Sequence, residues 1–188
     1  MRDISMHLMD IIQNSLRASA KNIEITIVAS LINDMLEISV VDDGSGMNKE
    51  FVSNVTDPFV TTRKTRKIGL GIPMFKESAK SSGGYFKINS EISEGTSISA
   101  GFKISHIDRI PLGDIAETIS QVVMSKPETD LKLNLKSDIN EYEFDTKEIK
   151  KALKDVSIAE IDVIDWIKEN IDEGIISTLG GVLNEITG

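Results

Sequence analysis

Along residues 4–104, segments whose apolar residues have the spacing of a helix are followed by segments in which apolar and polar residues alternate, as in a strand. This succession of segments constrains the fold more than any other feature. Met9, Ile12 and Leu16 recur at the spacing of one helix face, whereas residues 22–30 alternate apolar with polar side chains as a half-buried strand does. The predicted elements are a helix over 4–20, strands over 22–30 and 35–41 around Asn33-Asp34, a short helix over 49–55, a helix over 71–81, and strands over 85–92 and 96–104. One helix is thus followed by two strands, twice.

The pattern changes after residues 106–111, so we expect a domain boundary that separates residues 1–105 from residues 106–188. The elements predicted beyond it are a helix near 113–124, a hairpin of 131–135 and 142–144 around Ser137-Asp138-Ile139-Asn140, and helices with N-caps at Asp145 and Ser157. We expect this C-terminal α+β extension to pack on the first unit or to bind a partner.

Apolar residues at helical spacing fill the last quarter of the chain. They are Ile161, Ile164, Trp166, Ile167, Ile171, Ile176, Leu179, Val182, Leu183 and Ile186. Such stripes usually form core, so we predict that most of them are buried. The alternative is a surface that docks a partner protein, because exposed apolar patches mark interfaces.

Composition restricts the kinds of partner. The net charge of −9 argues against a nucleic-acid surface, since phosphate backbones attract basic patches. The absence of cysteine excludes disulfides and thiolate metal sites. No apolar run approaches the roughly 20 residues of a membrane-spanning helix, and the N-terminus lacks the layout of a signal peptide. We therefore expect a cytoplasmic protein without a nucleic-acid or membrane partner.

Asp10, Asn14 and Ala18 lie four residues apart and share one face of the first predicted helix. The carboxamide oxygen of Asn14 is a hard ligand suited to Mg²⁺, which usually keeps several waters and bridges substrate phosphates. Asp10, one turn earlier, could accept a proton as a general base. On an amphipathic helix alone the same residues would be solvent-facing polar side chains, so both assignments depend on the motifs downstream.

A carboxylate and two glycines follow the second predicted strand in Asp42-Asp43-Gly44-Ser45-Gly46. A buried carboxylate can accept a hydrogen bond from the exocyclic amine of adenine, and glycines let the backbone approach the base and sugar. We predict that Asp42 reads the base and that Gly44 and Gly46 lie beside it. An ordinary turn is the alternative, because Asp and Gly favour turns.

Gly69-Leu70-Gly71-Ile72 leads into the predicted helix over 71–81, whose first amides could face phosphate oxygens. Residues 56–68, here called the lid, lack a clear period and predict a mobile loop. The lid carries four basic residues and two hydroxyl donors, namely Arg63, Lys64, Arg66, Lys67, Thr61 and Thr62. This charge suits a triphosphate, although a charge run can also be a solvated surface.

Several other nucleotide and hydrolase motifs are missing. The sequence has no Gly-x-x-x-x-Gly-Lys-Ser/Thr, no catalytic His-Arg-Asp and no Gly-x-Ser-x-Gly. P-loop, eukaryotic-type kinase and hydrolase interpretations are therefore excluded. A dinucleotide-binding fold is disfavoured, because Gly44-Ser45-Gly46 opens no long helix in a strand-helix-strand unit.

In this order the motifs resemble those of the GHKL superfamily of ATP-binding proteins, which includes DNA gyrase, the MutL mismatch-repair protein, sensor histidine kinases and anti-sigma-factor kinases. Asp10 to Ala18 resembles the N box, Asp42 to Met47 the first glycine box, Pro58 to Lys64 the phenylalanine box of histidine kinases, Gly69-Leu70-Gly71 the second glycine box, and Gly95-Thr96 the glycine-threonine near the last strand. The resemblance covers residues 4 to about 104. It implies a Bergerat-type two-layer α/β sandwich, with helices on one face of a mixed sheet and ATP between the helices and the lid.

The resemblance also implies ATP and Mg²⁺ as cofactors. The nucleotide contacts that it assigns are Asn14, Ala18, Asp42, Gly44, Gly46, Met47, Thr61, Thr62, Lys64, Gly69, Leu70, Gly71, Ile72 and Thr96, with Asn14 on the metal. Asp10 stands where gyrase and MutL place a catalytic glutamate and is shorter by one methylene. Lys67-Ile68 replaces the glycine-threonine that usually opens the second glycine box of histidine kinases. No helix with a phosphoacceptor histidine is expected before the N box, so a self-phosphorylating sensor kinase is not expected.

Two functions follow from these predictions. The first is a histidine-kinase-like protein that binds Mg-ATP and either hydrolyses it or transfers its terminal phosphate to a partner protein. The alternative is a non-catalytic switch in which ATP orders the lid and thereby changes a partner-binding surface on residues 105–188. A scaffold that binds no nucleotide would require all the motifs to be coincidental.

Overall fold

The computed structural model describes residues 3–55 and 71–183. In chain order the elements are α1 (Ile4–Arg17), β1 (Asn22–Ser30), β2 (Met35–Asp42), α2 (Lys49–Val55), α3 (Gly71–Ser81), β3 (Tyr85–Glu91), β4 (Gly95–Lys103), α4 (Ile115–Ser125), β5 (Asp130–Ser137), β6 (Glu141–Asp145), α5 (Thr146–Leu153) and α6 (Ile161–Leu183). The helix and strand order predicted for residues 4–104 is therefore confirmed.

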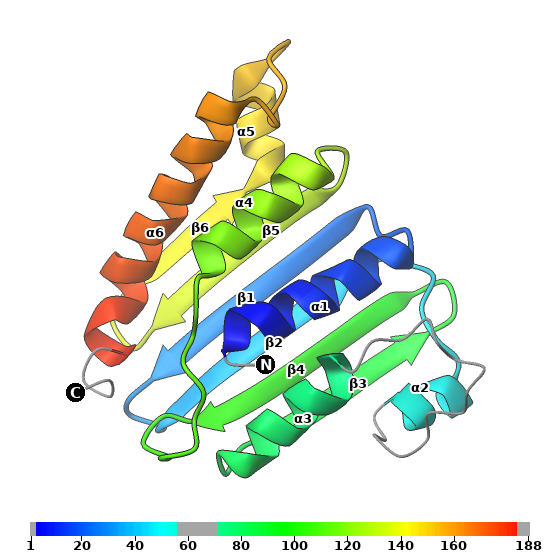
Figure 1. Ribbon diagram of the computed structural model, residues 1–188, viewed down its shortest axis with the longest axis vertical. Coiled ribbons are helices and arrows are strands. Elements are labelled where there is room, and N and C mark those ends of the chain that lie inside the picture. Colours follow the sequence, from blue (N-terminus) through cyan, green and yellow to red (C-terminus); the bar gives the residue numbers. More distant parts are fainter. Residues whose placement is uncertain (1–2, 56–70, 184–188) are drawn as a thin grey trace.

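All the strands belong to one mixed sheet, in the order β3-β4-β2-β1-β5-β6. The pair formed by β1 and β5 is parallel, and the other pairs are antiparallel. Helices α1, α3, α4 and α6 lie across the same face of this sheet (Figure 1). Burial alternates along β1 and β2, because their aliphatic side chains face the helices and residues such as Glu24 and Glu37 face solvent. The predicted α+β two-layer sandwich is confirmed.

Local signals explain where the first elements begin and end. The carboxylate of Asp3 accepts a hydrogen bond of 2.9 Å from the amide of Met6 and caps the start of α1. The helix ends at Arg17, earlier than predicted, because Ser19 adopts a φ of 62° that no helix can continue. Asp34 closes the turn between β1 and β2 with a φ of 51°. The strands on either side match their predicted bounds to within one residue.

The C-terminal residues extend the same sheet. β5 pairs with β1 from Asn22↔Asp130 to Ala29↔Ser137, and β6 returns beside β5 as the predicted hairpin. Asp145 caps α5 as predicted, accepting a hydrogen bond of 2.8 Å from the amide of Lys147.

The N-cap predicted at Ser157 is wrong. The Ser157 hydroxyl accepts a hydrogen bond of 3.2 Å from the amide of Ala159 within a local turn, and α6 begins only at Ile161. The hydroxyl is therefore engaged before any helix starts, as serine side chains often are in turns.

Most of the apolar stripe on α6 is core. Ile164, Ile167, Ile171, Leu179 and Val182 are buried, while Ile161, Trp166 and Ile176 are exposed. Ile186 lies outside the described residues. None of the described helices combines the length and the apolarity that crossing a bilayer requires.

His7 is a buried imidazole inside this core. Its ring lies 5.3 Å from that of Phe75, and its Nε2 lies 3.3 Å from the hydroxyl of Ser78. Nδ1 has no hydrogen-bond partner among the described residues. Burial lowers the pKa of His7 below the ordinary value of 6.5, and this effect outweighs the opposing carboxylates of Asp10 and Asp3. The imidazole is therefore neutral in the folded protein near neutral pH.

This burial predicts a specific loss of stability in acid. Because the pKa of His7 is lower in the folded than in the unfolded chain, protons bind the unfolded chain first as the pH falls below 6.5. The free energy of unfolding should therefore decrease between pH 7 and pH 5, and His7→Gln should flatten this decrease. Urea denaturation at several pH values measures it. His106→Gln is the matched control, because His106 is the second of the two histidines and is partly exposed. An equal flattening in the control would contradict the assignment.

Candidate functional site

A cavity of about 260 Å³ opens where α1 meets the end of β2, the turn after β2, and the start of α3. Its walls come from segments that are far apart in the sequence. They are Ile11, Asn14, Ser15, Arg17, Ala18, Asp42, Ser45, Gly46, Met47, Phe51, Val55, Ile72, Thr96 and Ile98. The mixture of apolar walls with a few polar groups is typical of a small-molecule site.

Asp42 is the buried charge of this cavity. It ends β2 with a side chain only 8% exposed. Ser15 donates a hydrogen bond of 2.6 Å to Oδ2, and the amide of Gly44 donates one of 2.9 Å to Oδ1. A buried carboxylate needs such donors because burial penalises its charged form. Each oxygen has a second lone pair, so the carboxylate can still accept a bond from a ligand.

The turn after β2, residues 43–47, is here called the glycine turn, and it fits the cavity because Gly44 and Gly46 carry no side chains. A Cβ added to Gly44 would lie 2.8 Å from the Cβ of Ala18 at the end of α1. Gly46 has a φ of +64°, and a Cβ there would lie 1.8 Å from the carbonyl oxygen of Glu91. Both glycines are therefore required by close backbone approach, and Gly46 also by its left-handed conformation.

The turn between β3 and β4 packs directly on the glycine turn. The amide of Ser93 donates a 2.9 Å hydrogen bond to the carbonyl of Ser45, whose own amide bonds the carbonyl of Ala18 at 2.9 Å. A Cβ at Gly95, which has a φ of +91°, would lie 1.9 Å from the carbonyl oxygen of Asp42. Helix α1, the glycine turn and the β3–β4 turn thus form one hydrogen-bonded unit.

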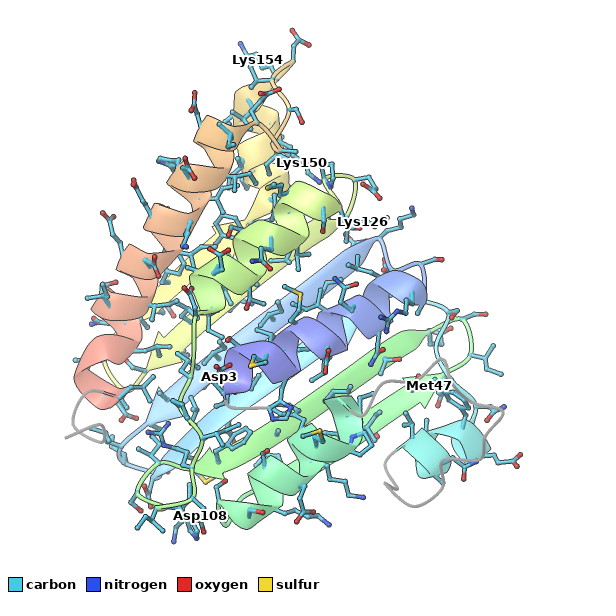
Figure 2. The ribbon with its side chains drawn as sticks, viewed as in Figure 1. Asp3, Met47, Asp108, Lys126, Lys150 and Lys154 are labelled. Atoms are coloured by element: carbon cyan, nitrogen blue, oxygen red, sulfur yellow. The ribbon has the colours of Figure 1, made fainter. Side chains whose placement is uncertain are left out.

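Ser90 connects the two turns through its side chain. Its hydroxyl accepts a hydrogen bond of 2.8 Å from the amide of Met47 and lies 2.9 Å from the hydroxyl of Thr96. Figure 2 shows Met47 at the edge of the sheet beside α2, where the chain leaves the glycine turn. Ser90 therefore fixes two cavity residues, Met47 and Thr96, against each other.

Asn14 lies on the cavity wall with a half-buried side chain. Its Oδ1 accepts a hydrogen bond of 3.1 Å from Nη1 of Arg17. Because Arg17 is exposed, its guanidinium can turn into solvent and leave this oxygen to a cation. One amide oxygen combined with phosphate oxygens and waters is a coordination set that suits Mg²⁺, so the side chain fits the ion.

Asp10 lies one turn before Asn14 and faces the start of α3. A Cβ added to Gly71 would lie 2.6 Å from the Cβ of Asp10 and 2.7 Å from its Oδ2. Gly71 is therefore the residue that lets α3 approach α1 at this point. The carboxylate of Asp10 consequently lies at the N-terminal end of α3, where helix amides and the helix dipole favour negative groups.

Asp43, next to Asp42, has a different environment. Its carboxylate accepts hydrogen bonds from the amides of Lys21 and Asn22, at 2.7 and 2.9 Å, and from the Asn22 side chain at 2.6 Å. Burial acts to raise the pKa of Asp43, but these hydrogen bonds outweigh it and the pKa is lowered. Asp43 therefore joins β1 to the turn and is not among the residues that line the cavity.

Most of the described residues predicted to bind nucleotide meet at this cavity. Those that line it are Asn14, Ala18, Asp42, Gly46, Met47, Ile72 and Thr96, while Gly44 contacts Asp42 and Ala18, and Gly71 contacts Asp10. Thr61, Thr62, Lys64, Gly69 and Leu70, together with the lid, lie outside the described residues.

Sequence reasoning missed several residues of the site. They are Ile11, Ser15, Arg17, Ser45, Phe51, Val55 and Ile98 on the walls, and Ser90 behind them. Ser15 carried a signal, because it lies four residues after Ile11 on the buried face of α1. A hydroxyl at a core position of a helix indicates a buried polar partner. No local pattern marks Ser90, whose bonds join residues from different hairpins.

A two-layer sandwich with a buried carboxylate in a partly apolar cavity between a helix and a glycine turn suits a small ligand that carries an amine. Residues 2–106 match the model of the family described as histidine kinase-, DNA gyrase B-, and HSP90-like ATPase. Since this match covers more than half of the chain, the protein belongs to that family, and the resemblance inferred from the motifs is confirmed. Residues 2–106 thus form an ATP-binding domain of the histidine-kinase-like type.

Similar proteins agree with this membership. Sporulation kinase D of Bacillus subtilis (strain 168) is 28% identical over 102 residues, which are 54% of this chain and 20% of that protein. Sporulation kinase C of the same organism is 34% identical over 87 residues, which are 46% of this chain and 20% of that protein. The chain thus spans about a fifth of the length of these relatives. The solved N-terminal domain of a DNA repair protein has the same fold, with a TM-score of 0.52, 12% identity, and coverage of 77% of this chain and 52% of that one.

The hydrogen bond from Ser15 to Asp42 predicts a measurable loss of stability. Ser15→Ala leaves one oxygen of a buried carboxylate without its donor, which should lower the free energy of unfolding by about 1–3 kcal/mol. Urea denaturation near neutral pH measures the change. Ser45→Ala is the control, because Ser45 lines the same cavity with an exposed side chain that makes no hydrogen bond among the described residues. Equal stability of Ser15→Ala and the wild type would contradict the assigned role.

Proposed function

We propose that the protein binds Mg-ATP in the cavity between α1 and the glycine turn, and that it hydrolyses the nucleotide or transfers its terminal phosphate to a partner protein. The observation that carries the proposal is the buried carboxylate of Asp42, held by Ser15 and Gly44 at the wall of a cavity of about 260 Å³. A fixed acceptor inside an otherwise largely apolar cavity is the feature that selects an amine-bearing base.

The adenine ring has a matching environment in this proposal. Its exocyclic amine donates to Asp42, and its faces contact the apolar side chains of Ile11, Ile72 and Ile98, which line the same cavity. Thr96 lies on the wall with its hydroxyl donating to Ser90, whose own proton goes to the carbonyl of Gly95, so the free lone pairs of Thr96 can accept a hydrogen bond from the adenine amine. Gly44 and Gly46 leave room for the base and the sugar.

Mg²⁺ and the phosphates would lie toward Asn14 and the start of α3. Asn14 would hold the ion through Oδ1, and the ion would neutralise charge that develops on the transferring phosphate. The amides of Gly69, Leu70 and Gly71 and the side chains of Lys64, Thr61 and Thr62 are proposed phosphate contacts on the sequence argument. For Gly71 the position at the first turn of α3 supports this role.

Asp10 is the proposed general base. Its carboxylate lies against Gly71, at the helix end where the phosphates are placed, so a water or a hydroxyl between them can pass it a proton. We place the partner protein on residues 106–188, which lie beyond the matched family region apart from its last residue, 106. The acidic composition favours a protein partner over nucleic acid.

Replacing Asp42 tests nucleotide recognition. Asp42→Asn replaces one of the two carboxylate oxygens with an NH₂ group that cannot accept a hydrogen bond. Ser15, Gly44 and the adenine amine would then share a single neutral acceptor, so the dissociation constant for ATP should rise at least about tenfold. Titration calorimetry with millimolar Mg-ATP measures the affinity. Asp43→Asn is the matched control, because the Asp43 carboxylate bonds Lys21 and Asn22 and does not line this cavity. Absence of heat with the wild type, or equal affinity of Asp42→Asn, would overturn the proposal.

Replacing Asp10 separates catalysis from binding. Asp10→Asn keeps the shape but cannot accept a proton, so turnover should fall about 100-fold while ATP affinity stays within about threefold. Incubation with ATP labelled on its γ-phosphate, Mg²⁺ and cell extract measures both free phosphate and labelled protein. Turnover by Asp10→Asn equal to that of the wild type would refute the base assignment. A wild type that binds ATP but yields neither product would instead support the ATP-dependent binding switch.

A further inference from the structure

A second concave site lies on the C-terminal part of the molecule, away from the nucleotide cavity. A groove of about 320 Å³ runs between α5 and the first half of α6. It is lined by Ile149, Ala152 and Leu153 from α5 and by Asp162, Val163 and Trp166 from α6. Five of these six side chains are apolar, so the groove is a strip of hydrophobic surface open to solvent.

Trp166 is the dominant side chain of the groove. It is the single tryptophan of the chain and is 50% exposed. Ala152 is exposed beside it, while Ile149, Leu153 and Val163 are partly buried. Half-exposed tryptophan next to a concave apolar surface is the arrangement that supplies the central anchor in many protein interfaces.

The charged side chains that α6 places beside Trp166 are acidic. Asp162, Glu169 and Glu173 lie four residues before, three after and seven after Trp166, so they share its face of the helix. All three are exposed, and none forms an ion pair among the described residues.

Three of the nearby lysines already form ion pairs with other residues. Lys168 pairs with Glu117 on α4, Lys150 pairs with Asp130 at 2.8 Å, and Lys151 pairs with Glu148 at 2.6 Å. Lys154 lies at the tip of the molecule, where α5 ends (Figure 2). The rim that faces an occupant of the groove is therefore acidic on the α6 side, whereas on the α5 side Lys150 and Lys151 are paired and Lys154 forms no ion pair among the described residues.

We propose that the groove between α5 and α6 binds an amphipathic helix of a partner protein, with an apolar residue inserted beside Trp166 and lysine or arginine residues opposite Asp162, Glu169 and Glu173. Apolar burial supplies the affinity in such helix-in-groove complexes, and the acidic rim selects a cationic partner. The net charge of −9 opposes a second copy of this chain, and the acidic rim opposes an anionic membrane. The proposal rests on the C-terminal residues alone and does not require nucleotide binding.

Trp166 provides the signal for the test, because all the tryptophan emission of the chain comes from this one indole. The probe is a synthetic amphipathic peptide of leucine and lysine, about 18 residues or five helical turns long. Titration with it should shift the emission of Trp166 to shorter wavelength as the indole leaves water. The matched peptide with glutamate in place of lysine should cause no shift. A shift with both peptides, or with neither, would overturn the proposal.

Charge reversal distinguishes this groove from the general acidity of the protein. The triple variant Asp162→Lys, Glu169→Lys and Glu173→Lys should bind the lysine peptide with an affinity at least about tenfold lower than that of the wild type, as measured by calorimetry. The control triple variant Glu77→Lys, Glu128→Lys and Glu141→Lys makes the same change in net charge at exposed positions elsewhere. Its affinity for the lysine peptide should fall less than about threefold. Equal weakening by the two triple variants would refute the groove as the site.

A single neutral substitution tests the apolar part separately. Ala152→Gln places a longer side chain in the groove at an exposed helix position without changing charge or removing Trp166. It should abolish most of the emission shift while leaving ATP affinity unchanged, so a failure here is distinguishable from a failure of the nucleotide site. An unchanged shift in Ala152→Gln, self-association of the wild type through this face in sedimentation, or a shift with anionic vesicles would each contradict the proposal.

Discussion

The hydrogen bond between Ser15 and Asp42 joins α1 to the end of β2, and the shape of the cavity depends on it. β2 is a core strand, so a carboxylate at its buried end is tolerated only because donors reach it from outside the strand. Ser15 supplies one donor from the buried face of α1, and the amide of Gly44 supplies the other. The same bond that permits the charge therefore fixes how α1 lies against the sheet and which way Asp42 faces.

Close backbone packing extends this constraint to the neighbouring hairpin. Gly46 and Gly95 each leave space for a carbonyl group, of Glu91 and of Asp42 respectively, that a Cβ would occupy. Ser90 then joins the amide of Met47 to the strand that carries Thr96. The glycines of the motif are thus required first by protein packing, and any contact that they make with a nucleotide uses a backbone already held in position.

The sequence predicted what depends on neighbouring residues and missed what depends on distant ones. Alternating apolar residues located β1 and β2 to within one residue, because a half-buried strand imposes that period locally. The same periods carry no information on which strands pair, so the parallel contact of β1 with β5 was not predicted. Ser15 was missed for the same reason, because its partner is 27 residues away. Asp42 could be predicted because a carboxylate after an apolar strand is conspicuous. The N-cap prediction for Ser157 was wrong because a serine hydroxyl can accept a hydrogen bond from an amide in a turn as well as from one in a helix.

The pairing of β1 with β5 gives the C-terminal residues a direct connection to the site. Asp42 lies opposite Ile23 in the ladder of β2 and β1, and Ile23 lies opposite Leu131 in the ladder of β1 and β5. The amide of Leu131 then donates a buried hydrogen bond of 2.8 Å to the hydroxyl of Thr146, the first residue of α5. These paired residues therefore connect the buried carboxylate of Asp42 to α5, the helix that forms one wall of the Trp166 groove. Because backbone hydrogen bonds and not a linker join the two, the groove and the cavity keep a fixed geometry with respect to each other, and a partner bound at α5 would rest on the same strands that hold Asp42.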